Sequence, residues 1–451
     1  MERFHLSDLP EKARIHFIGI GGISMSGLAM IMLKNGYRVT GSDRTKSHIT
    51  DKLQTLGAEI FIGHNSENVL GADLVVHTAA VHMNNPEMAK AAELGLRLID
   101  RAEFLGAIMR EYKTAVGVAG THGKTTTTSM LAHALIYADL DPTISVGGEL
   151  DLIGGNIRTG SSEYFVTEAC EYTNSFLKFF PTIALITNIE EDHLDFFSGI
   201  DDIIKSFRKF ALLTKEDGCV IANGDDENIA KALDSTGCRI INYGMSRKNL
   251  YHPENLQYIG GYPSFEVYRD SQRLCSLSLN VPGEHNVLNA LATVAVCCQI
   301  GVDPAAAAKG IETFHGTHRR FEKKGMINEA TVIDDYAHHP TEIKTTLKTA
   351  QSMPHNKIWC IFQPHTYTRT KTLWKEFTEA FDDADELILT DIYAAREVYD
   401  GITRSEDLAE QIAKREKNHV RYIKDFSTIA QLIRREAQPG DMVFRSEEPH
   451  V

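Results

Sequence analysis

The chain has 451 residues, which is too long for one ordinary hydrophobic core and predicts about three domains. Its 61 acidic residues outnumber its 47 basic residues, and the net charge of −14 argues against nucleic acid as a partner. The seven cysteines form no CxxC pair, so we expect free thiols in a reducing compartment. No signal core or membrane-spanning stretch is visible, so we expect a cytoplasmic protein without a membrane partner.

The first hundred residues alternate short apolar runs with helical segments, which is typical of a parallel sheet with crossover helices. The predicted elements are residues 14–19, 25–35, 37–42, 49–56, 59–62, 74–77 and 86–93. A glycine-rich turn follows the first strand and could hold a diphosphate at a helix N-terminus, although tight strand-to-helix packing is the commoner reason for such a turn. Asp43, at the end of the second strand, is placed to meet a ribose hydroxyl.

A second unit begins near residue 113 with a strand at residues 114–118 and a helix at residues 129–138. The segment between them includes Gly120-Thr121-His122-Gly123-Lys124-Thr125-Thr126. Its two glycines let backbone N–H groups close on phosphate oxygens, Lys124 adds a positive charge, and Thr125 offers a hydroxyl to Mg²⁺. The strict Walker spacing fails, because Val118 stands where the first glycine would be. Strand, loop and helix together still predict that the chain binds a nucleoside triphosphate.

The second unit continues through predicted strands at residues 163–168, 183–188, 218–222 and 239–243, a β-hairpin region at 256–279 and a helix at 285–299. Glu168 follows a strand beside the phosphate loop and is placed to hold Mg²⁺, whereas a solvated turn acid is the better interpretation of Glu171. His193 lies amid acids and either coordinates a metal or caps locally. Asn289 shares a helix face with His285 and Asn286 that can meet a base or a phosphate, unless Asn286 simply caps the helix.

A third unit follows residue 316 and resumes the alternation. It comprises predicted strands at residues 331–334, 357–362 and 386–389 and predicted helices at 340–351, 373–381 and 405–417. His, Tyr, Arg and Asp crowd the segments after its three strands, where open α/β sheets bind ligands. Among them, Arg369 suits a substrate carboxylate, and the histidines could receive a proton from an amine. Arg319 and Arg320, just before this unit, either reach transferring phosphates or form a salt bridge at the domain border.

Together these motifs resemble the Mur ligase family, over nearly the whole chain and in the family's order. The matching segments are Gly19-Ile20-Gly21-Gly22 with Met25-Ser26-Gly27, the phosphate loop, Glu168, Asn188 with Asp192-His193, His285-Asn286 with Asn289, His318-Arg319-Arg320-Phe321, Asp335-Tyr336 with His338-His339-Pro340, and His365 to Arg369. The resemblance implies an α/β fold of three domains. They would be a Rossmann-like UDP-sugar domain (1–111), a central P-loop-type ATPase domain with a parallel sheet (112–316), and a C-terminal Rossmann-like domain (317–451) that closes on ATP and brings the amino acid.

The resemblance is strongest to the branch that adds L-alanine to UDP-N-acetylmuramate, the first peptide step of peptidoglycan precursor synthesis. It implies that the muramate carboxylate attacks the γ-phosphate of ATP to give an acyl phosphate, from which the amine of L-alanine displaces phosphate. We expect a monomer or a weak homodimer.

The same resemblance implies a role for each matching residue. Catalytic roles would fall to Lys124, His193, Arg320 and His338. ATP would contact Gly120, Thr121, His122, Gly123, Lys124, Thr125, Thr126, Asn289, Arg320 and Asp335. The UDP-sugar would contact Gly19, Gly21, Gly22, Ser24, Met25, Ser26, Asp43 and His77. The amino acid would contact Tyr336, His338, His365 and Arg369, and two Mg²⁺ ions would be held by Thr125, Glu168 and His193.

The sequence departs from the family pattern at several places. Phe207 stands near the position of a lysine that becomes a carbamate in relatives adding later amino acids, which favours the alanine-adding branch. Thr366 replaces a common arginine, which puts one anion contact in doubt, and Ser24 replaces a common glycine in the diphosphate turn. The end of the chain, residues 440–451, lacks the usual Gly-Ala-Gly-Asp turn, so we expect an edge element of the C-terminal domain to be missing.

Three other interpretations stay open at this stage. A recycling ligase of the same family would attach a whole tripeptide to UDP-N-acetylmuramate. A nicotinamide-dependent oxidoreductase would use the first glycine-rich turn, but the Gly-Lys-Thr loop has no role in it. A nucleotide-binding regulator without catalysis is favoured only by the unusual C-terminus.

Overall fold

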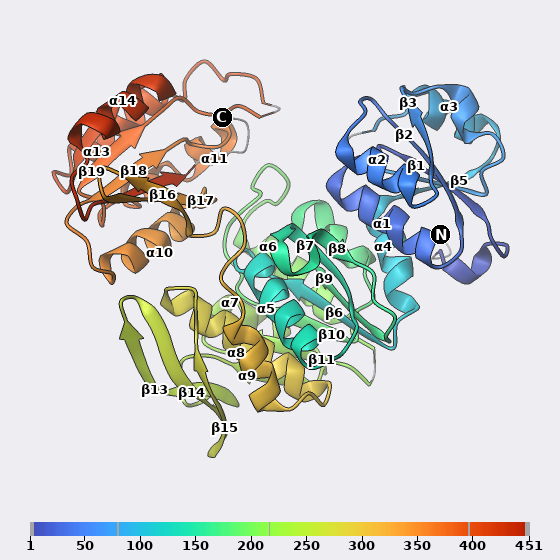
Figure 1. The fold of residues 1–451 in the computed structure, drawn as a ribbon, viewed down its shortest axis with the longest axis horizontal. Helices are drawn as coiled ribbons and strands as arrows, with labels where there is room; N and C mark the ends of the chain where they lie inside the picture. The colour runs from blue at the N-terminus through green and yellow to red at the C-terminus, as the bar shows by residue number, and fades with distance from the viewer. Residues whose placement is uncertain (1–3, 79–80, 216, 396, 447–451) are drawn as a thin grey trace.

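The structure is a computed structural model that describes residues 4–78, 81–215, 217–395 and 397–446. Figure 1 shows three α/β bodies, with the N-terminal domain in blue and the C-terminal domain in orange and red on opposite sides of the central domain. Among the described residues, no helix is long and apolar enough to cross a membrane. The expected α/β class with three sheets of mainly parallel strands is confirmed.

The N-terminal domain is built on a five-stranded parallel sheet with strand order β3-β2-β1-β4-β5. Its strands are β1 (Arg14–Ile18), β2 (Arg38–Asp43), β3 (Glu59–Ile62), β4 (Leu74–His77) and β5 (Arg97–Asp100), and its helices are α1 (Ile23–Lys34), α2 (His48–Thr55), α3 (Pro86–Glu93) and α4 (Arg101–Arg110). Strand order reverses between β1 and β4. The carboxyl edge at this point is where open α/β sheets bind ligands, and it carries the turn that begins at Gly19.

The central domain holds a ten-stranded sheet with strand order β15-β14-β13-β12-β11-β10-β6-β9-β7-β8. Its strands are β6 (Thr114–Ala119), β7 (Thr143–Leu150), β8 (Gly155–Arg158), β9 (Tyr164–Glu168), β10 (Ile183–Ile186), β11 (Cys219–Asn223), β12 (Ile240–Tyr243), β13 (Tyr251–Ile259), β14 (Tyr262–Arg269) and β15 (Gln272–Ser278). Its helices are α5 (Lys124–Tyr137), α6 (Ile200–Ala211), α7 (Glu227–Leu233), α8 (Glu284–Gln299) and α9 (Pro304–Glu312). The buried helix α5 packs against α8 and α9, and this packing fixes the phosphate loop at its N-terminus.

The C-terminal domain holds a six-stranded sheet with strand order β16-β17-β21-β18-β19-β20. Its strands are β16 (Glu322–Ile327), β17 (Ala330–Asp335), β18 (Ile358–Phe362), β19 (Glu386–Leu389), β20 (His419–Tyr422) and β21 (Met442–Ser446). Its helices are α10 (Pro340–Gln351), α11 (Tyr367–Thr372), α12 (Trp374–Thr378), α13 (Ser405–Ala413) and α14 (Phe426–Glu436). All its strands are parallel except β16, which runs antiparallel to β17.

The hydrophobic cores show how the three domains are joined. One buried cluster runs without a break from the N-terminal domain into the central domain. At this junction Gly106 of α4 meets the carbonyl oxygen of Lys178, which would lie only 1.9 Å from an added Cβ. The two buried clusters of the C-terminal sheet instead consist of residues beyond position 320. The C-terminal domain therefore meets the central domain largely through polar side chains. The domain boundaries after residues 111 and 316 remain predictions.

Several sequence expectations about single elements need correction. The helix predicted at 129–138 begins at Lys124, because Thr127 and Thr128 are buried within the helix instead of forming a loop. The predicted hairpin region is a three-stranded antiparallel extension, β13 to β15. The sequence patterns did not predict the elements β5, α4, β7, β8, α6, α7, α9, β16, α11, β20, α14 and β21.

The expected loss of an edge element from the C-terminal domain is wrong. Strand β21 is present and lies in the middle of the sheet, paired in parallel with β17 on one side and β18 on the other. Met442, Val443 and Phe444 are buried there, so an apolar strand fills the place where a glycine-rich ending was expected. The final part of the unusual C-terminus, residues 447–451, lies outside the described residues.

Candidate active site

The phosphate loop links β6 to α5 through two glycines whose conformations exclude side chains. Gly120 has a φ of +141°, and a Cβ there would lie 1.9 Å from the hydroxyl oxygen of Thr187. Gly123 has a φ of +83° and is the N-cap residue of α5. A left-handed residue at this point turns the chain so that the first backbone N–H groups of the helix face outward, where they favour an anion.

Lys124 is turned onto its own loop. Its ammonium donates to the carbonyl oxygens of Gly120 and Thr121 and lies 3.0 Å from a carboxylate oxygen of Glu171. Burial lowers the pKa of Lys124, but Glu171 more than offsets this effect, so its pKa is raised and it stays charged. The interpretation of Glu171 as a solvated turn acid is therefore wrong, because Glu171 is buried and pairs with the loop lysine.

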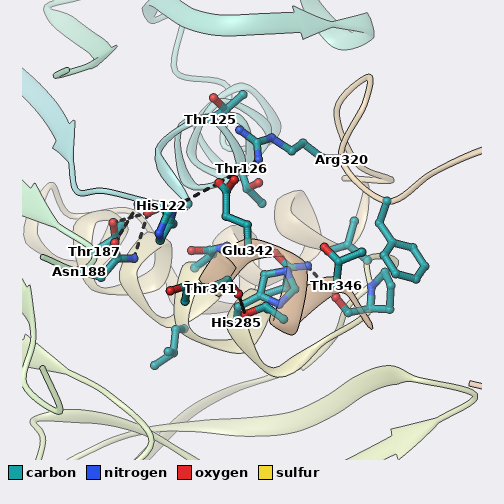
Figure 2. Close-up of a pocket in the computed structure, with 18 of the residues that line it drawn as sticks. His122, Thr125, Thr126, Thr187, Asn188, His285, Arg320, Thr341, Glu342 and Thr346 are labelled. Atoms are coloured by element: carbon teal, nitrogen blue, oxygen red, sulfur yellow. Dashed lines mark hydrogen bonds and ion pairs between the residues drawn. The ribbon is translucent and has the colours of Figure 1, made fainter. Parts of the chain in front are cut away.

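A cavity of about 380 Å³ opens beside the phosphate loop, between the central and C-terminal domains (Figure 2). Seven of the ten residues predicted to contact ATP line it: His122, Gly123, Thr125, Thr126, Asn289, Arg320 and Asp335. The other three, Gly120, Thr121 and Lys124, are not among the lining residues. The remaining wall includes residues that the sequence motifs did not indicate: Asn223, Asp225, Thr341, Glu342, Thr345 and Thr346.

Helix α8 contributes a fixed polar wall to this cavity. Asn289 accepts from the hydroxyl of Thr127 at 3.1 Å and donates to the side chain of Asn286 at 3.0 Å. Asn286 in turn donates to the carbonyl oxygen of Pro282 at 2.7 Å, and the N-cap residue is Gly283. The alternative that Asn286 caps the helix is thus wrong, and both asparagines are buried in one network that reaches α5.

Glu342 of α10 connects the two sides of the cavity and was missed by the sequence analysis. Its carboxylate lies 3.1 Å from Nδ1 of His122 and 3.4 Å from a guanidinium nitrogen of Arg320, and Figure 2 shows it between these two side chains. Burial alone would lower the pKa of His122, but Glu342 and Glu190 raise it to about 9. The available signal was local, since Glu342 stands three residues after His339 and completes a capping box at the start of α10.

Thr125 and Glu168 are brought together as the magnesium prediction requires. Burial raises the pKa of Glu168, while the backbone N–H of Gly147 and the hydroxyl of Thr125 act in the opposite direction by hydrogen bonding to it. A buried carboxylate beside a hydroxyl offers the oxygen donors that Mg²⁺ prefers, and a divalent ion would favour the ionised acid. These two residues therefore fit a magnesium ion.

His193 lies elsewhere, in a second cavity of about 150 Å³. Its ring packs against that of Tyr172 with centroids 4.5 Å apart and planes tilted by 30°, and its Nε2 lies 3.7 Å from the carboxylate of Asp192. Arg369 lines the same cavity, where its guanidinium lies 3.1 Å from Asp192 and 2.9 Å from Nδ1 of His365. Burial alone would raise the pKa of Asp192, but the positive charge of Arg369 holds this pKa well below its usual range. His193, which was predicted to hold a metal, is thus a neighbour of Arg369 and His365, which were predicted to bind the amino acid.

Tyr336 and His338 lie close to this second cavity. The rings of Tyr336 and His338 are 4.9 Å apart, and those of His338 and His365 are 6.1 Å apart. Burial lowers the pKa of His338 to about 4, so the imidazole is neutral near pH 7. Its Nδ1 lies 2.8 Å from the carbonyl oxygen of Tyr336. When Nδ1 carries the proton and donates to this carbonyl, Nε2 keeps a lone pair that can accept a proton.

Two departures noted in the sequence have clear structural outcomes. Phe207 lies in the buried core, with its ring 5.2 Å from that of Phe176, so this position provides no lysine for a carbamate. Thr366 has a φ of +64° and is the N-cap of α11, where its hydroxyl accepts from the backbone N–H of Arg369 at 3.4 Å. The missing arginine is therefore replaced by a residue that fixes the local backbone.

The N-terminal turn lies far along the chain from these cavities, at the carboxyl edge of the first sheet. Gly19 has a φ of +81°, and Gly22 is the N-cap of α1. Asp43 accepts from the backbone N–H of Gly21 at 2.9 Å, so it ties the turn to β2. His77 ends the neighbouring strand β4. Of the remaining predicted residues, Ser24 is partly exposed, whereas Met25 and Ser26 are buried and Ser26 donates to the carbonyl oxygen of Ile23.

Three family models match the chain in succession. The model for the Mur ligase family, catalytic domain, matches residues 14–113; that for the Mur ligase middle domain matches 118–297; and that for the Mur ligase, glutamate ligase domain, matches 319–446. Two relatives are named UDP-N-acetylmuramate–L-alanine ligase. The one from Clostridium tetani is 53% identical over 96% of this chain and 94% of its own length, and the one from Caldanaerobacter subterraneus is 53% identical over 97% and 95%.

Solved structures agree with these matches. The crystal structure of UDP-N-acetylmuramate-alanine ligase from Thermotoga maritima superposes with a TM-score of 0.76 and 32% identity, covering 97% of this chain and 96% of that one. A murein peptide ligase from Psychrobacter arcticus superposes with a TM-score of 0.67 and 26% identity, covering 96% and 95%.

Proposed function

Because the chain belongs to the Mur ligase family, we propose that it joins L-alanine to the carboxylate of UDP-N-acetylmuramate in a reaction driven by ATP. This is the first peptide step of peptidoglycan precursor synthesis, and we infer that the protein acts in the cytoplasm. The observation that carries the proposal is the pair of cavities at the border of the central and C-terminal domains. One cavity is lined by part of the phosphate loop together with Arg320 and Asp335, and the other is lined by Arg369.

The residues of the first cavity suit the phosphoryl-transfer half of the reaction. A carboxylate must approach the γ-phosphate, so two anions meet and their charge has to be neutralised. Arg320 lines this cavity, and Lys124 in the adjoining phosphate loop adds further positive charge. Thr125 and Glu168 would hold a magnesium ion, which supplies further positive charge to the phosphate oxygens when bound. Asn289 and Asp335 would contact the adenosine.

The residues of the second cavity suit the amide-forming half. The amine attacks the acyl carbon, phosphate leaves, and the amine must lose a proton. Arg369 would bind the carboxylate of L-alanine, with Tyr336 and His365 beside it. His338 has a neutral imidazole and can accept a proton at Nε2. His193 would hold a second metal ion near the acyl group. The glycine turn at Gly19 to Gly22, with Ser24, Met25, Ser26, Asp43 and His77, would bind the UDP-sugar.

The competing interpretations are weaker. The tripeptide-adding ligase is favoured less, because the relatives at 53% identity are named alanine ligases and the murein peptide ligase superposes with a lower TM-score and identity. The oxidoreductase is excluded by family membership. The regulator without catalysis loses its only support, because the C-terminal strand β21 is present.

The test is phosphate release from ATP and Mg²⁺ in the presence of UDP-N-acetylmuramate, with and without L-alanine, for the native chain and for Lys124→Ala. We expect release only when both substrates are present, and none from the variant. Replacing L-alanine by the tripeptide separates the two branches of the family. L-serine and glycine test how selective the amino-acid site is, because a methyl or hydroxyl group contributes only about 1–3 kcal/mol of discrimination. ATP binding without turnover would contradict the proposal.

A further inference from the structure

Three potential metal-binding side chains meet where the phosphate loop faces the C-terminal domain. They are His122 of the loop, Glu190 just after β10, and His339 just before α10, and we refer to them as the His–Glu–His cluster. Each offers one ligand atom, and these atoms lie within 4.8 Å of one another. The rings of His122 and His339 have centroids 5.0 Å apart. Glu190 and His339 have no part in the ligase reaction proposed above.

The His122 ring is oriented as a metal ligand would be. Its Nδ1 lies 3.1 Å from the carboxylate of Glu342, so the proton on Nδ1 can be donated to an acid. Its Nε2 is buried and has no hydrogen-bond partner among the described residues, although it lies 3.4 Å from a carboxylate oxygen of Glu190. Histidines that bind metals commonly donate their other ring N–H to a carboxylate in this way. Without a metal ion, this nitrogen faces the carboxylate of Glu190.

The other two members are also held in place. The Nε2 of His339 lies 2.9 Å from the carbonyl oxygen of Glu191, and its Nδ1 accepts from the backbone N–H of Thr341 at a longer 3.3 Å. A metal ion would replace the longer bond, while the carbonyl would keep the ring oriented through Nε2. The backbone N–H of Glu190 donates to the hydroxyl of Thr121 at 2.9 Å, which ties this acid to the phosphate loop.

We propose that the His–Glu–His cluster binds a divalent transition metal ion such as Zn²⁺, at a site separate from the magnesium residues Thr125 and Glu168. Two imidazole nitrogens and one carboxylate oxygen suit Zn²⁺ or Co²⁺, whereas Mg²⁺ prefers oxygen ligands alone. Three protein ligands leave one tetrahedral position open. Because His122 and Glu190 line the nucleotide cavity, this position is accessible to water or to a phosphate oxygen.

The three ligands of the His–Glu–His cluster come from two domains. His122 and Glu190 belong to the central domain and His339 to the C-terminal domain, which meet here through the contacts of His122 with Glu342 and of His339 with Glu191. A metal ion that bridges them stabilises the arrangement in which all three are close, by mass action. We expect Zn²⁺ to slow turnover, because it holds the walls of the nucleotide cavity together.

The experiment is a titration of the metal-free full-length protein with Co²⁺, followed by its visible absorption, and then displacement by Zn²⁺. His339→Asn removes one ligand but keeps a residue that caps helices well, and Glu190→Gln removes the charge at constant shape. His355→Asn is the matched control, since His355 lies beyond the far end of α10 with its Nδ1 bonded to the carbonyl oxygen of Met353. His193→Asn tests whether the signal comes from the second cavity instead.

We expect one equivalent of Co²⁺ with tetrahedral absorption bands in the native protein, in His355→Asn and in His193→Asn. In His339→Asn and Glu190→Gln the affinity should fall about tenfold or more. Zn²⁺ should also raise the unfolding temperature of the native protein more than that of these two variants. The proposal is overturned if either ligand variant binds Co²⁺ as the native protein does, if His193→Asn loses the signal, or if the native protein binds no Co²⁺. None of these readouts depends on ligase activity.

Discussion

The carboxylate of Glu342 lies 3.1 Å from Nδ1 of His122, although the two residues are 220 positions apart. One belongs to the C-terminal domain and the other to the phosphate loop of the central domain. The same carboxylate lies 3.4 Å from Arg320, and it lines the nucleotide cavity. A single half-buried acid therefore contacts His122 across the domain border and Arg320 within its own domain.

We predict that Glu342→Gln lowers kcat/KM for ATP roughly 10- to 100-fold, because two charged partners lose their acid while the shape is kept. Steady-state kinetics of phosphate release would measure this. Glu376→Gln on α12 is the matched control, since Glu376 is exposed and its loss should leave kcat/KM unchanged. Equal kinetics in the Glu342 variant and the control would show that the contact has no part in turnover.

A second prediction concerns the magnesium residues. Glu168→Gln should raise the Mg²⁺ concentration needed for half-maximal activity roughly tenfold or more, because a carboxylate ligand is lost. The control is Glu163→Gln, which removes an acid that lies just before the start of β9 and pairs with Lys113 on the surface. Activity would be recorded over a range of Mg²⁺ at saturating substrates, and an unchanged midpoint would rule out Glu168 as a ligand.

The third prediction tests the backbone of the phosphate loop. Gly120→Ala should destabilise the protein by roughly 2–4 kcal/mol, because the added Cβ would meet the Thr187 hydroxyl oxygen and the positive φ disfavours a side chain. At Gly36 the φ is +83° but nothing lies within 4 Å of an added Cβ. Gly36→Ala should therefore cost only about 1 kcal/mol. Urea unfolding compares the two, and equal losses would refute the steric argument.

The fourth prediction concerns acid stability and Glu87, which is fully buried in the N-terminal domain. Burial alone would raise its pKa, but His16, whose Nε2 lies 3.8 Å away, and hydrogen bonds with Ser42, Asn68 and His64 lower the pKa to about 2 from an ordinary value of 4.5. The folded state therefore favours the ionised acid. The stabilisation is fully present above about pH 4.5 and is lost as the pH falls toward 2.

Glu87→Gln should consequently be less stable than the native protein by roughly 2–3 kcal/mol at pH 7, and this difference should shrink as the pH falls below 4.5. Urea unfolding at several pH values provides the measurement. Glu93→Gln, on the exposed end of the same helix, should leave both the stability and its pH dependence unchanged. A difference that stays constant with pH would mean that Glu87 contributes through packing alone.

Much of the fold followed from local patterns. Alternating apolar runs and helical segments predicted the parallel sheets, and the spacing of Gly120, Gly123 and Lys124 predicted the phosphate loop. The failures were of two kinds. The predicted N-terminus of α5 was wrong because its first turns contain four threonines, which have low helix propensity. This helix is stabilised by burial instead. Strand β21 was doubted because its ending departs from the family pattern, yet its apolar residues were enough to place it between β17 and β18.

The sequence by itself determined the phosphate-binding chemistry, the α/β class and the family, because each depends on residue type and on spacing within a few turns of chain. Only the tertiary structure decided that Glu171 pairs with Lys124, that Glu342 meets His122, and that His193 lies beside Arg369. Such contacts depend on strand order and on how the domains pack. Neither is encoded in local periodicity, because burial and charge pairing act between residues that are distant along the chain.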